Sequence, residues 1–283
     1  KIAADKAAVD SMRNELNKID MNGQIVIGEG ELDQAPMLYI GEKLGSGVGP
    51  NFDIAVDPLE GTNFAANNLP GALSVIAVSE NSNLFNAPET YMNKIAISSP
   101  DKGIVDLDNN VTQNIKNLAE YKNTKPDNLT ACILDRPRHK DHIDQLKSLN
   151  VKLKLISDGD VSGALLVTNK KYNVDIFLGI GGGPEGVLAA SALDAYGCFF
   201  QGKFLFDNDD DKLRANKMGI KDFEKKYYLN EIVSGDSIFC ATGITSGDLV
   251  QGIHFDQNSF TSETLITHKS SGIKKIVQST HNI

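Results

Sequence analysis

Apolar residues recur with two different periods along the chain, and stretches of each kind follow one another from the first residues onward. A stripe at helical spacing predicts a helix over residues 5–22, with Gly23 as its C-terminal stop. Residues 25–27 and 52–56 form continuous apolar runs that predict buried strands. The second of these strands is expected to end at Pro58, because proline cannot donate to a central ladder.

The same alternation continues through the rest of the sequence. Further strands are expected over residues 72–79, 94–98, 129–134, 151–156, 174–180 and 237–241. Further helices are expected over residues 112–122, 140–149, 184–196 and 207–217. Strands that alternate with helices predict an α/β protein, built as one compact unit with two lobes near residues 1–125 and 126–283.

Acidic residues follow two of the predicted strands at short distance. The hexapeptide Asp57-Pro58-Leu59-Glu60-Gly61-Thr62 delivers two carboxylates and a hydroxyl at a strand end, where open α/β sheets bind ligands. Hard oxygen donors packed so closely suit Mg²⁺ or Mn²⁺ better than zinc. Glu29 stands between two glycines after the strand 25–27, which aims its carboxylate inward. The competing interpretations are a polar turn for the hexapeptide and an acidic surface turn for Glu29.

Other predicted strands are also followed by acidic residues. Asp158 and Asp160 follow the strand 151–156, and Glu185 follows the glycine run 181–183, whose backbone N–H groups are candidate oxyanion donors. Acidic loops gathered at one sheet edge would repel one another, and divalent cations would relieve that repulsion.

Two arginines after the strand 129–134 complete the candidate chemistry. Arg136 and Arg138 suit phosphate, because a guanidinium binds oxyanions through two parallel hydrogen bonds. A surface cluster of ion pairs is the alternative for this pair. His139 and His142 are expected to be exposed at a helix start rather than to bind a metal.

Composition excludes several classes of protein. The chain has 283 residues, 41% hydrophobic and 23% charged, with a formal net charge of −9 that argues against a nucleic-acid partner. No apolar run reaches membrane-spanning length, and the three separated cysteines are expected to be buried free thiols. The chain begins at Lys1 rather than Met, so a preceding segment is expected. Walker A, dinucleotide-binding and nucleophile-elbow patterns are absent.

The hexapeptide resembles the metal-binding signature of the lithium-sensitive sugar phosphatase superfamily, which includes inositol monophosphatases. Further motifs indicate one family within this superfamily. They are residues 27–33 with 35–39, residues 86–91, residues 181–186 and residues 241–243. Together they resemble the class II fructose-1,6-bisphosphatases of the bacterial type, over the whole chain. That family usually has a further helix before the position of Lys1.

The resemblance implies an α-β-α-β-α sandwich with mixed sheets and hydrolysis of the 1-phosphate of fructose 1,6-bisphosphate to fructose 6-phosphate, in gluconeogenesis. The implied cofactor is Mn²⁺ or Mg²⁺, held by Asp5, Glu29, Asp57, Glu60 and Glu185. Implied sugar-phosphate contacts come from Glu60, Gly61, Thr62, Tyr91, Arg136, Arg138, Asp158, Asp160 and Gly182. Thr62 is the implied hydroxyl that activates the attacking water, and we expect Glu29 to be its partner because a free hydroxyl is a weak base.

Two other functions fit the same residues. One is a bisphosphatase that also accepts a seven-carbon sugar, sedoheptulose 1,7-bisphosphate. The other is a sugar-phosphate sensor without catalysis, which would need no water activator such as Thr62. The alternative for Thr62 itself is a cap on the helix that follows. We further expect a cytoplasmic homo-oligomer, dimer or tetramer, with no membrane partner.

Overall fold

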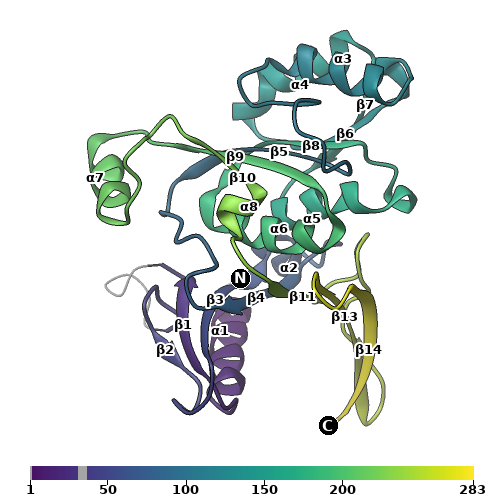
Figure 1. The fold of residues 1–283 in the computed structure, drawn as a ribbon. Coiled ribbons are helices and arrows are strands. Elements are labelled where there is room, and N and C mark those ends of the chain that lie inside the picture. Colours follow the sequence, from purple (N-terminus) through teal and green to yellow (C-terminus); the bar gives the residue numbers. More distant parts are fainter. Residues whose placement is uncertain (1, 31–36) are drawn as a thin grey trace. The chain divides into compact units, whose positions relative to one another are not determined.

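The computed structural model describes residues 2–30 and 37–283, and the chain forms two compact units (Figure 1). One unit contains the residues up to Ala87 together with Ile232–Ile283, and the other is the continuous segment Pro88–Glu231. This division differs from the expected lobes at 1–125 and 126–283, because the C-terminal strands return to the sheet that the N-terminal strands begin. The expected motif residues 31–36 lie outside the described part of the chain.

The first unit is built on a mixed sheet of eight strands among the described residues, in the order β12-β13-β11-β4-β3-β1-β2, with β14 also paired to β13. These strands are β1 (Asn22–Ile27), β2 (Lys43–Leu44), β3 (Asn51–Glu60), β4 (Leu73–Glu80), β11 (Ser237–Gly243), β12 (His254–Phe255), β13 (Ser259–His268) and β14 (Ile273–Asn282). Strands β1 and β3 run parallel, and the other pairs are antiparallel. The unit also holds helices α1 (Ile2–Leu16) and α2 (Thr62–Ala66).

Helix α1 covers one face of this sheet. Its Val9 and Leu16 pack with Ile25 of β1 and with Ile54 and Val56 of β3 in a buried apolar cluster. Over residues 52–57, alternation along β3 therefore directs the even-numbered residues toward the helix and the odd-numbered residues to the opposite face.

The first helix is shorter than its apolar stripe predicts. It ends at Leu16, and the chain joins the sheet when the Asn22 N–H donates to the Pro50 carbonyl at 2.9 Å. The expectation that Gly23 stops the helix is wrong. Gly23 lies within β1, where any Cβ would meet the Ile54 side chain at 2.5 Å, so packing of that isoleucine requires the glycine.

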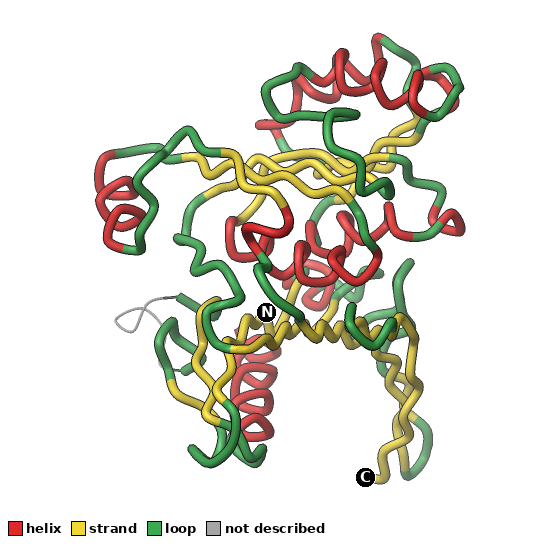
Figure 2. The backbone as a smooth tube through the Cα atoms, viewed as in Figure 1, coloured by secondary structure: helices red, strands yellow, loops and turns green. Residues whose placement is uncertain are grey.

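The second unit holds a mixed sheet of six strands among the described residues, ordered β10-β9-β5-β8-β6-β7. These strands are β5 (Tyr91–Ile97), β6 (Thr130–Leu134), β7 (Lys152–Ile156), β8 (Ile176–Gly182), β9 (Phe199–Leu205) and β10 (Lys226–Tyr228). Its helices are α3 (Val111–Tyr121), α4 (Lys140–Ser148), α5 (Asp160–Leu165), α6 (Gly183–Tyr196) and α7 (Asp209–Lys217), while α8 (Leu229–Ile232) leads back to the first unit. Figure 2 shows how these helices and strands alternate along the chain.

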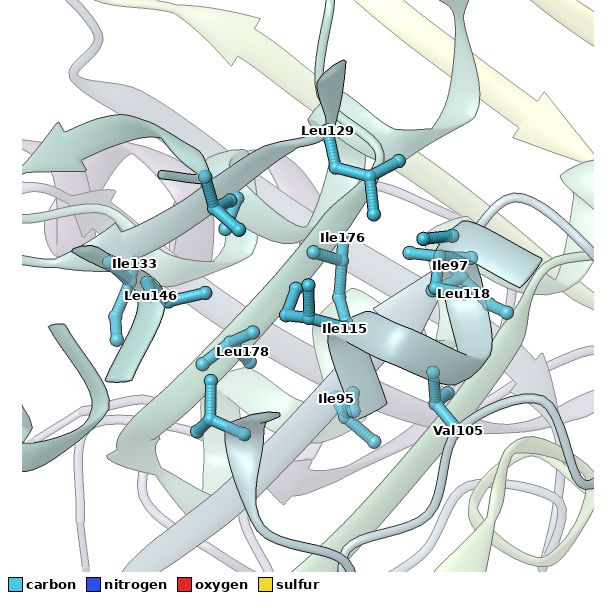
Figure 3. Close-up of a cluster of buried hydrophobic side chains, with 14 of the residues drawn as sticks. Ile95, Ile97, Val105, Ile115, Leu118, Leu129, Ile133, Leu146, Ile176 and Leu178 are labelled. Carbon is cyan, nitrogen blue, oxygen red and sulfur yellow. The ribbon is translucent and has the colours of Figure 1, made fainter. Parts of the chain in front are cut away.

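Helices cover both faces of the second sheet. On one face, Ile115 and Leu118 of α3 and Leu146 of α4 pack against Ile95 of β5 and Ile176 of β8 (Figure 3). On the other face, α5 and α6 lie against β5, β6, β8 and β9. Helices layered on mixed sheets confirm the predicted α/β fold class.

Among the described residues, no helix is long and apolar enough to cross a membrane. The three cysteines are free, as expected, and Cys132 and Cys198 are buried. Cys240 is partly exposed, which departs from the expectation of three buried thiols.

Candidate active site

Asp57 and Glu60 are brought to the same face of the first sheet by an irregularity in β3. Asp57 lies opposite Val75 of β4, and Glu60 lies opposite Leu73, so three steps along β3 match two steps along β4. Side chains alternate along a strand, and residues three apart share a face only when an extra residue intervenes. The irregularity between Asp57 and Glu60 supplies that residue. It also lets the strand continue to Glu60, so the expectation that β3 ends at Pro58 is wrong.

Gly61 turns the chain from β3 into α2. Its φ of 77° is in the left-handed region, which glycine adopts without steric cost. The helix begins at Thr62, so Gly61 and not Thr62 occupies the N-cap position, and no side-chain hydrogen bond caps this helix. Thr62 is therefore not the N-cap of this helix, contrary to the alternative role considered for it.

Glu29 and Asp5 form a second acidic pair in the first unit. Loss of water around Glu29 raises the pKa of its carboxyl, and the negative charge of Asp5 raises that pKa further. Asp5 of α1 is only partly exposed. A cation next to Glu29 would offset the negative charge of Asp5 and favour the ionised form of the Glu29 carboxyl.

In the second unit, Asp160 is paired with a residue that sequence reasoning missed. Lys94 is 1% exposed in the middle of β5, and its ammonium donates to Asp160 and, at 2.7 Å, to the Gly182 carbonyl. Asp160, itself 7% exposed, is the first residue of α5. A lysine followed directly by the apolar residues 95–97 is the sequence signal that could have identified this buried ion pair.

Glu185 lies beside this ion pair in the first turn of α6. Burial raises the pKa of its carboxyl, and the Asp160 carboxylate raises it further while the Lys94 charge opposes the rise. A Cβ at Gly182 would overlap the Glu185 carboxylate, and a Cβ at Gly181 would overlap that of Asp160. These glycines therefore make room for carboxylates.

The glycine run is less open to an oxyanion than the sequence suggested. Gly181 and Gly182 belong to β8 and pair with Met92 and Tyr91 of β5. The Gly183 N–H donates to the Thr90 carbonyl at 2.8 Å, so this N–H is already engaged.

A pocket of about 290 Å³ opens beside Glu185. Its lining includes Tyr91, Gly182, Glu185, Leu205 and Asp207, all within the second unit. The volume is at the lower end of the range typical of small-molecule sites. Two of the residues implied as sugar-phosphate contacts, Tyr91 and Gly182, thus share one pocket with an implied metal ligand.

The two arginines are held in different ways. The Arg138 Nε donates to the Ile180 carbonyl at 2.9 Å, and its guanidinium carbon lies 4.9 Å from the centre of the Tyr91 ring. Arg136 approaches the Asp158 carboxylate at 3.9 Å, with both side chains partly exposed. The carbonyl engages one of the five N–H donors of Arg138, and stacking on the ring fixes the plane of the guanidinium.

His139 is fully buried, which corrects the expectation of an exposed histidine. Its Nε2 accepts from the Ile180 N–H at 2.7 Å, and Nδ1 lies 2.8 Å from the Leu134 carbonyl. A backbone N–H can only donate and a carbonyl can only accept, so the proton is on Nδ1 and the ring is neutral. Burial and the nearby Arg138 charge lower the pKa of His139 to about 4. The ring is therefore a structural link between β6 and β8.

This buried neutral histidine predicts a loss of stability in mild acid. Between the ordinary pKa of 6.5 and about 4, the unfolded chain binds a proton that native His139 does not. The free energy of unfolding should fall as pH is lowered through that window, by about 3 kcal/mol in total at about 1.4 kcal/mol per pH unit. Denaturant unfolding of the parent and of His139→Gln at pH 7 and pH 4.5 measures the difference. If His139→Gln loses as much stability between pH 7 and pH 4.5 as the parent, His139 is not the source of the pH dependence. His254→Gln, which replaces an exposed histidine, is the matched control and should behave like the parent.

The carboxylate oxygens of the acidic residues are suitable ligands for a divalent cation. In the described part of the chain, these residues lie in pairs. Asp5 with Glu29 and Asp57 with Glu60 offer carboxylate oxygens, the ligands that Mg²⁺ and Mn²⁺ prefer. Within residues 2–30 and 37–283, no three or more His, Cys, Asp or Glu side chains gather as a metal-binding group. The pKa of the Glu29 carboxyl, raised by burial and further by the Asp5 charge, favours a cation at this position.

The comparisons place the chain in a class of enzymes, the hydrolases of phosphoric monoesters. The family model described as bacterial fructose-1,6-bisphosphatase, glpX-encoded, matches residues 1–281. The chain belongs to this family.

Curated relatives are similar over nearly their whole length. The chain is 42% identical to the D-fructose 1,6-bisphosphatase class 2/sedoheptulose 1,7-bisphosphatase of Prochlorococcus marinus strain AS9601, over 98% of this chain and 88% of the relative. Proteins of the same name from Prochlorococcus marinus strain MIT 9515 and Synechococcus sp. strain RCC307 are 44% and 40% identical. These alignments cover 93% and 98% of this chain and 83% and 87% of the relatives.

Proposed function

We propose that this protein hydrolyses the 1-phosphate of fructose 1,6-bisphosphate, releasing fructose 6-phosphate and phosphate, with Mn²⁺ or Mg²⁺ as cofactor. The observation that carries the proposal is the family match over residues 1–281, together with the acidic residues and Thr62 that the chain retains. A sugar-phosphate sensor would need neither the complete acidic set nor a water-activating hydroxyl.

The acidic residues would hold the cofactor. Asp5, Glu29, Asp57, Glu60 and Glu185 are the proposed ligands. A bound divalent cation supplies positive charge that polarises a phosphate and stabilises the leaving oxygen.

The remaining residues would bind the substrate and move the proton. Thr62 is proposed to take the proton of the attacking water, with Glu29 as the carboxylate that accepts it. Arg136 and Arg138 would hold the phosphate that does not react, because guanidinium groups match its oxygens in pairs. Tyr91, already stacked against Arg138, would keep that guanidinium in the plane needed for this contact.

Phosphate release from a panel of substrates tests the proposal. Fructose 1,6-bisphosphate should be hydrolysed with Mn²⁺ or Mg²⁺, inositol 1-phosphate should not, and exhaustive chelation should abolish turnover. Asp57→Asn should be inactive, which assigns the measured activity to this chain. Full turnover after chelation would refute the metal requirement, and a preference for inositol 1-phosphate would refute the substrate.

A second activity is favoured by the names of the relatives, which pair fructose 1,6-bisphosphatase with sedoheptulose 1,7-bisphosphatase. We propose that this chain also accepts the seven-carbon bisphosphate. The ratio of kcat/KM for the two sugars in one preparation measures it, and absence of phosphate release from the seven-carbon sugar would refute it.

Replacement of Arg138 should weaken substrate binding more than catalysis. Arg138→Lys keeps a positive charge but loses the planar fork, so KM should rise about 10-fold or more while kcat changes little. Steady-state kinetics with fructose 1,6-bisphosphate measure this effect. A loss confined to kcat would instead place Arg138 at the reacting phosphate. Lys203→Ala, which removes an ion pair with Glu224 in the same unit, is the control and should leave KM unchanged.

We also propose a cytoplasmic homo-oligomer, dimer or tetramer, acting in gluconeogenesis. Soluble enzymes of this kind are commonly symmetric assemblies. Light scattering coupled to size-exclusion chromatography measures the mass in solution, and a monomer at micromolar concentration would refute the assembly.

A further inference from the structure

Lys94 occupies a position where a lysine is rarely found. It is central in β5, its exposed fraction is 1%, and its cross-strand neighbours are Gly179 of β8 and Gly202 of β9. Removing an ammonium group from water is costly unless the group is paired and hydrogen-bonded. Asp160 and the Gly182 carbonyl provide that pairing.

The surrounding backbone is shaped to fit this ammonium group. A Cβ at Gly181 would lie 3.0 Å from the Lys94 nitrogen and would overlap the Asp160 carboxylate. A Cβ at Gly186 of α6 would lie 3.4 Å from Cδ of the lysine. Three elements, β8, α5 and α6, therefore meet around one side chain.

The neighbours of the ammonium resemble the ligands of a metal ion. A carboxylate oxygen from Asp160 and a backbone carbonyl oxygen from Gly182 are both donors that hard divalent cations accept. Glu185 stands next to them, and the Asp160 charge acts on it. Without Lys94, the buried Asp160 carboxylate, the partly exposed Glu185 carboxylate and a carbonyl would lie close together with no positive charge between them.

We propose that Lys94 is a built-in cation that fills the position a metal ion would otherwise take between Asp160 and the Gly182 carbonyl. Of the three groups around it, Asp160, Glu185 and the Gly182 carbonyl, Lys94 leaves only Glu185 available to bind a metal ion. This inference rests on the proposed metal-dependent function. A fixed cation keeps Asp160 out of metal coordination at every metal concentration, so the lysine sets how many ions the second unit binds.

Lys94→Met tests the proposal directly. Methionine keeps an unbranched apolar stem but ends one atom short of the lysine nitrogen, so it vacates the ammonium position. Titration of the metal-free protein with Mn²⁺, followed by electron paramagnetic resonance, should show about one more bound ion per chain than in the parent. Adding Asp160→Asn to Lys94→Met should remove the extra ion.

A matched variant controls for the general loss of an ion pair. Lys122 pairs with Asp175 in the same unit, and Lys122→Met should bind the same number of ions as the parent. An ion count for Lys94→Met equal to that of the parent overturns the proposal. An extra ion that persists after Asp160→Asn also overturns it, because the ion would then lie elsewhere.

Folding of the variant gives a further measurement. Mn²⁺ should raise the Tm of Lys94→Met by more than it raises that of the parent, because a ligand that binds the native state stabilises it. Lys94→Gln, which retains a donor for the Gly182 carbonyl, should respond in the same way. If both variants are unfolded without metal, refolding on addition of Mn²⁺ supports the proposal, and failure to refold overturns it.

The ion count separates this proposal from the proposed function. Mn²⁺ binding is measured without substrate, so a parent protein that releases no phosphate refutes the function while the ion count still decides the role of Lys94. A parent that hydrolyses fructose 1,6-bisphosphate, with no extra ion in Lys94→Met, refutes the role of Lys94 alone.

Discussion

Thr62→Val should lower kcat for fructose 1,6-bisphosphate by about 10²–10⁴-fold, the usual cost of losing one positioned proton-transfer group. Valine keeps the branched shape of threonine and removes the hydroxyl. KM should change much less, because the arginines and the acidic residues remain. The Tm should stay close to that of the parent, since Gly61 and not Thr62 occupies the N-cap of α2.

Thr62→Ser provides the matched comparison. Serine retains the oxygen but loses the methyl group that restricts the rotamer, so it should keep appreciable activity below that of the parent. Thr264→Val controls for removal of a threonine hydroxyl, because it breaks the 2.9 Å contact with Thr242 and should leave kcat unchanged. A Thr62→Val enzyme with near-normal kcat and a lowered Tm would show that the hydroxyl is structural.

Gly182→Ala should reduce kcat/KM by about 100-fold, although it adds a single methyl group. The backbone at Gly182 has φ −61° and ψ 144°, which alanine adopts without strain. The added Cβ would overlap the Glu185 carboxylate, which must move away. Misplacement of a reacting group by about 1 Å costs on the order of 10²-fold in rate. Mn²⁺ affinity should fall together with kcat/KM, because Glu185 is a proposed ligand.

Gly197→Ala is the control for a glycine substitution near the same helix. Gly197 follows the C-terminus of α6 at φ 64°, and a Cβ there meets nothing within 4 Å. Alanine should therefore cost about 1 kcal/mol of stability through backbone strain alone and leave kcat/KM unchanged. An active Gly182→Ala enzyme with unchanged Mn²⁺ affinity would show that Glu185 tolerates displacement.

Local periodicity predicted several elements of the second unit closely, although α5, β9 and β10 were not predicted. The helix expected over 140–149 is α4 (Lys140–Ser148), and the strand expected over 151–156 is β7 (Lys152–Ile156). Both have their apolar residues and turn signals within a short stretch of chain. The placement of Glu185 in the first turn of α6 was predicted for the same reason, from a strand followed by glycines and a proline.

Features that depend on a distant strand could not be predicted. The bulge that puts Asp57 and Glu60 on one face exists only in relation to β4, so Pro58 alone suggested the end of a strand. The division into units depends on the pairing of β4 with β11, which no local pattern signals.

Buried polar residues were the other failure of sequence reasoning. His139 precedes a helix among charged residues, which favours exposure, yet partners on two separate strands satisfy both of its nitrogens. Lys94 was passed over because burial of a lysine depends on an acid 66 residues away. Satisfaction of a polar group by remote partners is a property of the folded chain, not of its local sequence.

The return of the C-terminal strands to the first sheet has a consequence for synthesis on the ribosome. Strand β4 is complete long before its partner β11 exists, and Ser79 must await the carbonyl of Asp236, 157 residues later, to which its hydroxyl donates. At about 5–20 residues per second, the open edge of β4 lacks that partner for roughly 8–30 s. The second unit is continuous and is translated completely within this interval. Nascent chains should therefore depend on chaperones at the unpaired edge of β4, where another chain could pair in place of β11.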